Sequence, residues 1–433
     1  MRMAPSLPRA TRGLLAAALA VAVLSGCGGG DDESPFAPPK GESDATAELG
    51  IPVLATRNTT RTATDDPVAA AAASAQAAFP GASRASRAKA VAIVDKGDWR
   101  AALAATALVA PPVGAPLLFS DGDELPDTTT KAIDALAPSG GTGDGPQALR
   151  IGDVGRPTGV RAENIAGRDP YELARAIDRY TTEARNRTAD RVLVVSADRP
   201  EFAAPAAAWL AKSGDPVAFV TSKGIPAATA RQLAAHPKAT LYVLGPSAVI
   251  RPAITKRLRR YGTVKRVGGV TPVDNAIGFA KYQDGAFGWG TVQPGHGFTV
   301  ARQTDTLGAI ALAPFSTSGL HGPLLLTDRA DAVPTSLRDY LLDVKPGYDP
   351  NVRDLEASNI RSYNRAWIAG TPEQIGAKQQ AQLDTLLEIG LVSTDPDAGE
   401  DLLEDDDPTP AAPTGGTSTA PRGATTTAPT PRP

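Results

Sequence analysis

The stretch "RVGGVTPVDNAIGFAKY", residues 266–282, decides how the fold of this chain is predicted. It begins with strand-like residues, passes through two glycines and continues with the apolar spacing of a helix. A weaker copy, "NIAGRDPYELARAIDRY", stands at residues 164–180 and aligns with it without a gap; Thr271 and Asp169 are equivalent, and a proline follows each. Because Thr and Asp accept hydrogen bonds from first-turn amides, and proline suits the first helical position, both copies predict a strand, a glycine break and a capped helix. We call this unit the joint.

A third and more divergent copy of the joint begins at Asp66, which is again followed by a proline and an apolar helical stretch, "VAAAAASAQAAF". Glu172 and Asp274 lie three residues after the other two caps, where an acidic side chain can complete a capping box. Three copies of one joint predict three copies of one structural unit.

The residues between the joints follow the same order in every copy. Each unit predicts a strand, a helix, a second strand after a proline, a polar turn, another helix and a third strand. Short apolar strands alternating with helices indicate parallel βαβ units with helices on both faces of the sheet. A repeat of about 100 residues is too long for a solenoid turn and fits a small α/β domain. First strands are expected at 91–95, 192–196 and 298–302, and second strands after Pro116, Pro216 and Pro323.

The N-terminus has the pattern of an export signal. Three arginines precede an uncharged run at residues 14–24, and "LSGC" follows, ending at Cys27. The run is shorter than the roughly 20 residues that a permanent membrane helix needs. "LSGC" resembles a bacterial lipobox, and Cys27 is the only cysteine of the chain. We therefore predict a lipoprotein signal peptide at residues 1–26 and a lipid on Cys27; an ordinary secretory signal that happens to contain a cysteine is the alternative.

A lipid on Cys27 would leave no thiol for a disulfide, a metal or catalysis. Removing the signal peptide takes away three arginines and no acid, so the net charge would fall from −3 to −6. A single acyl chain binds a membrane only marginally, at about 0.8 kcal/mol per buried methylene, whereas two or three chains should hold the protein nearly permanently. We expect the protein to be anchored to the membrane and not to span it.

The repeated motifs resemble the cell wall-binding repeat 2 family of Gram-positive surface proteins. The resemblance is carried by "RVGGVTPVDNAIGFA", "NIAGRDPYELARAI", "YVLGPSAVI" and "PVAFVTSKGIPAATA", and it extends over residues 51–394. It implies three tandem Rossmann-like modules that bind no cofactor and attach proteins to anionic wall polymers. The predicted fold class is therefore α/β, with three tandem small parallel-sheet modules between a disordered N-terminal tether and a disordered C-terminal tail.

The domain prediction follows from the joints and from the polar composition of the two ends. It comprises a signal peptide (1–26), a flexible tether (27–50), a degenerate first repeat (51–162), a second repeat (163–265), a third repeat (266–394) and an acidic, then Pro/Thr-rich tail (395–433).

The sequence offers little that could carry catalysis. The sequence has three histidines, His236, His296 and His321, and the last two have no second histidine or carboxylate at metal-ligand spacing. The Gly-x-Ser-x-Gly elbow and the phosphate-binding P-loop are both missing. The acidic turn "SDGDELPD", residues 120–127, lacks the length and order of a calcium loop. We expect no enzyme activity, no metal and no cofactor.

One basic cluster stands out within "AITKRLRRYGTVKR", residues 253–266. An apolar stripe of Ala253, Ile254, Leu258 and Tyr261 should turn the cations outward, where they could hold a phosphate-rich or uronic polymer by a salt-sensitive attraction. The alternative is a solvated helix whose cations favour its own C-terminal dipole. The candidate binding residues are Lys256, Arg257, Arg259, Arg260, Lys265 and Arg266.

Together these features predict an exported surface lipoprotein on the outer face of the cell membrane that contacts the wall and binds cell-wall or envelope polymer without catalysis. Its expected partners are an anionic wall polymer and, through the lipid, the membrane; the near-neutral charge gives no reason to expect nucleic acid. Two alternatives are a solute-binding lipoprotein of a transporter, which would need two lobes around one cleft, and an envelope hydrolase with an unrecognised site.

Overall fold

The computed structural model describes residues 54–83, 86–141, 143–317, 321–348 and 363–391. The predicted signal peptide, Cys27, the tether and the tail lie outside the described residues. The elements below all belong to the compact unit that begins at Ile51.

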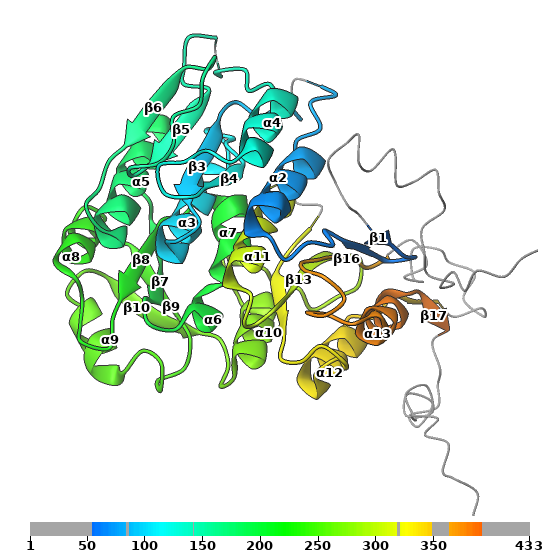
Figure 1. The fold of residues 1–433 in the computed structure, drawn as a ribbon. Coiled ribbons are helices and arrows are strands. Elements are labelled where there is room, and N and C mark those ends of the chain that lie inside the picture. Colours follow the sequence, from blue (N-terminus) through cyan, green and yellow to red (C-terminus); the bar gives the residue numbers. More distant parts are fainter. Residues whose placement is uncertain (1–53, 84–85, 142, 318–320, 349–362, 392–433) are drawn as a thin grey trace, which may run out of the picture. The chain divides into compact units, whose positions relative to one another are not determined.

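Three sheets form the framework, and within each the first four strands are parallel (Figure 1). The first has the order β4 (Leu117–Ser120), β3 (Val91–Asp95), β5 (Ala148–Ile151), β6 (Ala162–Ile165). The second has the order β8 (Val217–Val220), β7 (Arg191–Ser196), β9 (Thr240–Leu244), β10 (Thr263–Val267). The third has the order β14 (Leu324–Thr327), β13 (Gly297–Arg302), β16 (Arg365–Ile368), β2 (Thr59–Arg61), with β1 (Leu54–Ala55) antiparallel at its edge. The predicted α/β class with repeated parallel sheets is confirmed.

The three sheets share one register, which marks them as structural copies. In each, an amide of the central strand donates to the carbonyl of the proline that precedes the second strand. These bonds are Ala92 to Pro116 (2.9 Å), Leu193 to Pro216 (3.0 Å) and Thr299 to Pro323 (3.1 Å).

The helices occupy equivalent places in the three copies. The joint helices are α2 (Pro67–Ala78), α5 (Pro170–Arg185) and α10 (Pro272–Lys281). The first crossovers are α3 (Trp99–Ala105) with the 3₁₀ turn η1 (Thr106–Leu108), α6 (Pro200–Ala203) with α7 (Ala206–Ser213), and α11 (Thr306–Ala311) with η2 (Ala313–Ser316). The second crossovers are α4 (Asp127–Leu136), α8 (Ala227–Ala234) and α12 (Thr335–Asp343). Helices α9 (Pro252–Leu258) and α13 (Ala377–Leu387) follow β9 and β16, whereas no helix separates β5 from β6. Two short pairs complete the fold, β11 (Gln283–Asp284) with β12 (Phe287–Gly288) and β15 (Gly347–Tyr348) with β17 (Gly390–Leu391).

Each joint helix crosses from one sheet to the next. Helix α5 follows β6 of the first sheet but packs against β8 and α8 of the second. Likewise α10 follows β10 and packs against β14 and α12 of the third sheet, and α2 follows β2 of the third sheet and packs against β4 and α4 of the first. The joint occurs three times in the sequence because the chain makes the same crossing between neighbouring modules three times.

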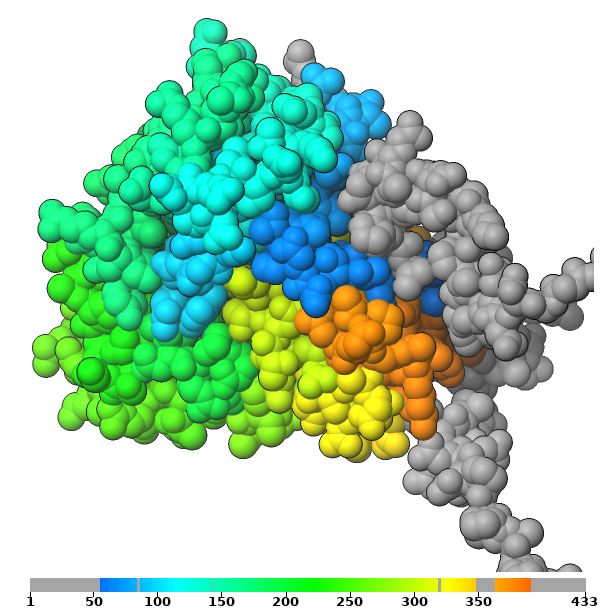
Figure 2. Space-filling view, in the orientation of Figure 1, coloured from blue at the N-terminus to red at the C-terminus, as the bar shows by residue number. Residues whose placement is uncertain are grey.

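The fourth strand of the third sheet comes from the start of the described chain. Strand β2, which lies in the stretch assigned from sequence to the first repeat (51–162), pairs in parallel with β16 of the third. Figure 2 shows residues near the start of the described chain, in blue, beside residues near its end, in orange. Each joint begins within the fourth strand of a sheet. The module boundaries predicted from the sequence, at 162/163 and 265/266, therefore fall inside β6 and β10.

The predicted helix caps are present. Asp169 accepts hydrogen bonds from the amides of Tyr171 (2.9 Å) and Glu172 (2.8 Å), and Asp66 caps α2 in the same way. Thr271 and Asp274 form a reciprocal capping box. Glu172 differs from the prediction, because it accepts from the amide of Arg168 (3.3 Å), one residue before the cap.

The joint glycines are required by the close approach of the helix that follows them. A Cβ on Gly268, whose φ is +115°, would lie 1.9 Å from Oδ1 of Asn275 in α10. A Cβ on Gly167 would lie 2.7 Å from the amide nitrogen of Leu173 in α5. Only glycine lets the chain turn back so tightly onto its own helix.

The first crossover helices α3, α7 and α11 contact one another between the sheets. Their interior is rich in alanine; Ala102, Ala105, Ala207 and Ala211 are almost fully buried. Small side chains let these short helices approach closely, so the modules share part of one hydrophobic core.

Candidate functional site

The predicted basic cluster lies on the outer edge of the second sheet. Helix α9 ends at Leu258, and the chain returns as β10, the edge strand beside β9. Ile254 and Leu258 are buried as expected, but Ala253 is exposed and Tyr261 is only half-buried, because the helix stops one turn earlier than the apolar stripe implied. All six candidate cations are exposed.

Two of the six cations have partners within the fold. Arg266 donates to the carbonyls of Gly245 (2.5 Å) and Ile250 (2.8 Å), and partial burial lowers the pKa of its guanidinium. Lys265 forms an ion pair with Asp284 of β11, which lowers the pKa of that carboxyl group. These two side chains fasten β10 to its surroundings.

The other four cations, Lys256, Arg257, Arg259 and Arg260, form no ion pair within the described part of the chain. They stand together at the C-terminal end of α9, so their charge is directed to solvent. We call these four residues the α9 cations.

The tertiary structure adds two cations that the sequence pattern did not include. A Cβ on Gly224 would lie 2.7 Å from Nη1 of Arg257, so the tight turn after β8 lies directly against α9. Arg251 donates to the carbonyl of Ser222 in that turn, and exposed Lys223 is the next residue. The turn is distant from α9 in sequence, so spacing alone could not have joined them.

The acidic side chains at the carboxyl ends of the central strands hold turns together. Asp95 accepts from the amides of Gly97 (2.9 Å) and Gly122 (3.1 Å), and Asp198 accepts from the amide of Ser222 (2.6 Å). Asp305 caps α11 by accepting from the amide of Gly308 (2.9 Å). Parallel sheets commonly bind ligands at the carboxyl ends of their strands. Here that edge carries carboxylates, so it is unsuited to binding a polyanion.

The acidic turn at residues 120–127 is also held internally. The backbones of Asp121 and Glu124 close it through an antiparallel bridge, and Asp121 pairs with Lys96 at 2.7 Å. Across the described ranges, no group of three or more His, Cys, Asp or Glu side chains could hold a metal ion.

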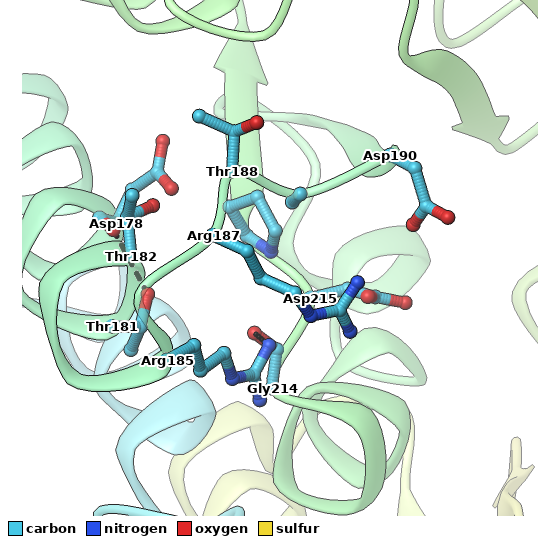
Figure 3. Close-up of a pocket in the computed structure, with 11 residues that line it drawn as sticks. Asp178, Thr181, Thr182, Arg185, Arg187, Thr188, Asp190, Gly214 and Asp215 are labelled. Atoms are coloured by element: carbon cyan, nitrogen blue, oxygen red, sulfur yellow. Dashed lines mark hydrogen bonds between the residues drawn. The ribbon is translucent and has the colours of Figure 1, made fainter.

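The three histidines lie in separate environments. His236 and Asp178 form a buried pair with 2.7 Å between Nε2 and Oδ2. Burial alone would lower the pKa of His236, but the hydrogen bond to Asp178, the negative charge of that carboxylate and the hydrogen bond to the carbonyl of Ala189 together outweigh burial and raise the pKa. The cavity beside Asp178, drawn in Figure 3, measures about 10 Å³ and has room for one water at most. Burial lowers the pKa of His296, and burial together with Arg365 lowers the pKa of His321 to about 4.

The described residues contain no helix long and apolar enough to cross a membrane. No protein-family model matches the chain. The search of curated proteins likewise gave no match.

The solved structures that share the fold include two from Clostridium difficile. One is Cwp8 from Clostridium difficile, with a TM-score of 0.57 at 17% sequence identity, covering 80% of this chain and 54% of that one. The other is Cwp6 from Clostridium difficile, with a TM-score of 0.56 at 16% identity, covering 73% of this chain and 46% of that one. This chain thus matches about half of the length of either protein. The likeness is one of fold, and it agrees with the repeat architecture expected from the sequence.

Proposed function

We propose that this protein is an exported lipoprotein of the cell envelope that binds an anionic wall polymer without catalysis. The observation that carries the proposal is the group of four α9 cations, which are exposed and have no carboxylate partner among the described residues. The fold shared with two cell wall proteins supports the same setting.

Electrostatics explains how the α9 cations would act. The mature chain would carry net negative charge, so a local group of unpaired cations is the place where a polyanion is attracted. Arg251 and Lys223 extend the positive surface beside them. Exposed charges are screened beyond about 8–10 Å at physiological salt, so binding should weaken as salt rises.

A non-catalytic role is supported by the surroundings of the one histidine–carboxylate pair in the described residues. His236 and Asp178 are enclosed beside a cavity with room for a single water, so a substrate could not reach them. The carboxylates at the carboxyl ends of β3 and β7 are likewise bonded to backbone amides.

The interlocked modules argue against a solute-binding protein that closes two lobes around one cleft. Joint helices tie the first sheet to the second and the second to the third, and β2 with α2 ties the third back to the first. A hinge between any two modules would have to break one of these ties.

The test is a pull-down of the full mature protein on purified cell walls over a range of salt concentrations. Changing Arg257, Arg259 and Arg260 together to Gln should weaken binding and flatten its salt dependence. The matched control changes Arg156, Arg168 and Arg179 to Gln; these arginines are also exposed and form no ion pair with another described residue. Equal binding by both triple variants, with unchanged melting, would contradict a role for the α9 cations.

A further inference from the structure

One position in the repeat is occupied by side chains in the second and third modules and is open in the first. It lies between the end of each joint helix and the loop that leads into the second strand. In the second module, α5 runs for 16 residues, and its last residue, Arg185, donates to the carbonyls of Ser213 and Gly214 at 2.7 Å each. Only the water-sized cavity of Figure 3 remains there.

In the third module, the same position is filled by an aromatic side chain. Helix α10 has 10 residues, and the β11–β12 hairpin follows it. Trp289, just after the hairpin, lies against Gly322 in the loop before β14, and its ring centroid is 5.4 Å from that of Trp209 in α7.

In the first module, the described residues provide neither filling. Helix α2 has 12 residues, one turn fewer than α5, although both begin at an Asp-Pro cap. Past its end lies a cavity of about 710 Å³, within the size range of small-ligand sites. We call it the α2 cavity.

The α2 cavity has an apolar floor and an aromatic wall. Its floor includes Ala78 and Phe79 at the end of α2 and Val109 after η1. Its wall is Phe315 and Trp367, whose rings stack with centroids 4.1 Å apart. Trp367 is half-buried in β16, so the wall belongs to the third sheet and the floor to the first module.

A second, smaller cavity adjoins the first. It measures about 220 Å³ and shares His321 and Trp367 with the α2 cavity. Tyr363, which is 54% exposed, and Arg365 line its far part. Trp367 thus lines both cavities, together with Phe315 in the larger one and Tyr363 in the smaller one.

The charge along both cavities is positive. Arg87 and Lys89 line the α2 cavity, Arg57 and Arg365 line the smaller one, and no Asp or Glu of the described residues lines either. Arg57 is paired with Glu388 at 2.6 Å, whereas Arg87 and Arg365 form no ion pair within the described ranges. Aromatic faces and unpaired cations with no acid beside them select a ligand that is both flat-faced and anionic.

From this geometry we infer that the α2 cavity binds an anionic saccharide, with the apolar face of a sugar ring against the Phe315–Trp367 wall and its acidic group toward Arg87 and Lys89. This rests on the proposed function, because it names a second, saccharide-sized contact with the wall polymer, separate from the α9 cations. The first module is then the one whose shortened joint helix makes room for a ligand.

The test is calorimetric titration of the full mature protein with four probes. Tri-galacturonate and glucose 6-phosphate both combine a sugar ring with an anion and distinguish uronic from phosphate chemistry. Maltotriose supplies the ring without the charge, and inorganic phosphate the charge without the ring. We expect at least one of the first two to bind and the last two to bind at least tenfold more weakly. Failure of both anionic sugars, or equal binding of a control probe, would overturn the inference.

Two variants locate the binding. Arg87→Gln with Lys89→Gln should weaken binding of the anionic saccharide at least tenfold, because the charge-assisted hydrogen bonds to its acidic group would be lost. Ala78→Trp should fill the cavity and weaken binding equally without changing charge. Arg156→Gln with Arg168→Gln, on another surface, should leave it unchanged. Full affinity in Ala78→Trp, with parental melting, would overturn the inference.

The wall pull-down, run in parallel, separates the two proposals. If the wild-type protein binds walls but neither anionic saccharide, the proposed function stands and the inferred saccharide site in the α2 cavity is wrong. If the protein binds an anionic saccharide, loses this binding in Ala78→Trp and does not bind walls, the saccharide site stands and the proposed wall-binding function is wrong.

Discussion

Arg61 of β2 donates from Nε and Nη2 to Oε1 of Gln380 in α13, 319 residues further along the chain, at 3.0 and 2.8 Å. The same guanidinium donates to the carbonyls of Gly370 (2.9 Å), Thr371 (3.0 Å) and Ile375 (2.6 Å). Arg61 is fully buried, and desolvation lowers its pKa to about 10, so it keeps its charge at neutral pH. This network fixes β2, near the start of the described chain, to the last module.

Replacing Arg61 with Met should destabilise the protein by at least about 2 kcal/mol, because several buried acceptors would lose their donor. Arg57→Met is the matched control: this neighbour has an exposed ion pair with Glu388, and such pairs contribute about 1 kcal/mol or less. Urea unfolding of both variants measures the difference. Equal midpoints would show that the buried network does not fasten β2.

Loss of a joint cap should weaken the module that the helix enters. Asp169→Ala and Thr271→Ala should each cost about 0.5–2 kcal/mol, because first-turn amides would lose their acceptor. Ser222→Ala should be nearly silent, since that hydroxyl is exposed in a turn. Thermal melts compare the three variants, and indistinguishable melting temperatures would contradict the role of the joints.

The joint glycine should tolerate no side chain. Gly268→Ala would place a methyl group against Asn275 in a left-handed conformation and should cost about 2 kcal/mol or more. Gly143→Ala has a similar positive φ of +111° but open space around its Cβ, so it carries the conformational cost alone. Chemical unfolding should therefore rank Gly268→Ala as clearly less stable, and the reverse order would refute the close approach.

Acid should destabilise the protein partly through His321. Because its folded-state pKa of about 4 lies below the usual value, the unfolded state binds more protons between about pH 6.5 and 4, and stability falls as the pH drops through that window. The effect is at most about 3 kcal/mol. Comparing the unfolding free energies of the wild type and His321→Gln between pH 7 and pH 4 isolates the contribution of His321. Parallel curves would mean that His321 is not held neutral.

The proposed anchor is tested at Cys27, which lies outside the described residues. Cys27→Ser should remove the lipid and either release the protein from the membrane or leave the signal peptide uncut. Fractionation of cells, with the mass of the product, measures both. A cleaved Ser variant that still sediments with membranes would show that another feature holds the protein there.

Local signals made the joints and the succession of strands and helices along the chain predictable. A cap side chain bonds amides two and three residues away, as Asp169 does with Tyr171 and Glu172, so the sequence contains both partners side by side. The same holds for Gly268, which is constrained by the helix that starts four residues later. The α/β class and its threefold repeat follow from such short-range patterns.

The tertiary structure alone decided where the ends of these units go. Any sheet edge offers the same backbone groups, so nothing in "TTR" at residues 59–61 indicates that it pairs with β16 and not with a strand of the first sheet. The tertiary structure also divides the basic cluster into two groups. Strand β10 brings Lys265 and Arg266 to partners within the fold, whereas the four α9 cations form no ion pair in the described chain. The α2 cavity depends on a one-turn difference between two helices and on Trp367 from a distant strand. The sequence by itself determined the repeated unit, because its signals act over a few residues; only the folded chain decided the closure of the third sheet and the cavity beside it, because those depend on groups hundreds of residues apart.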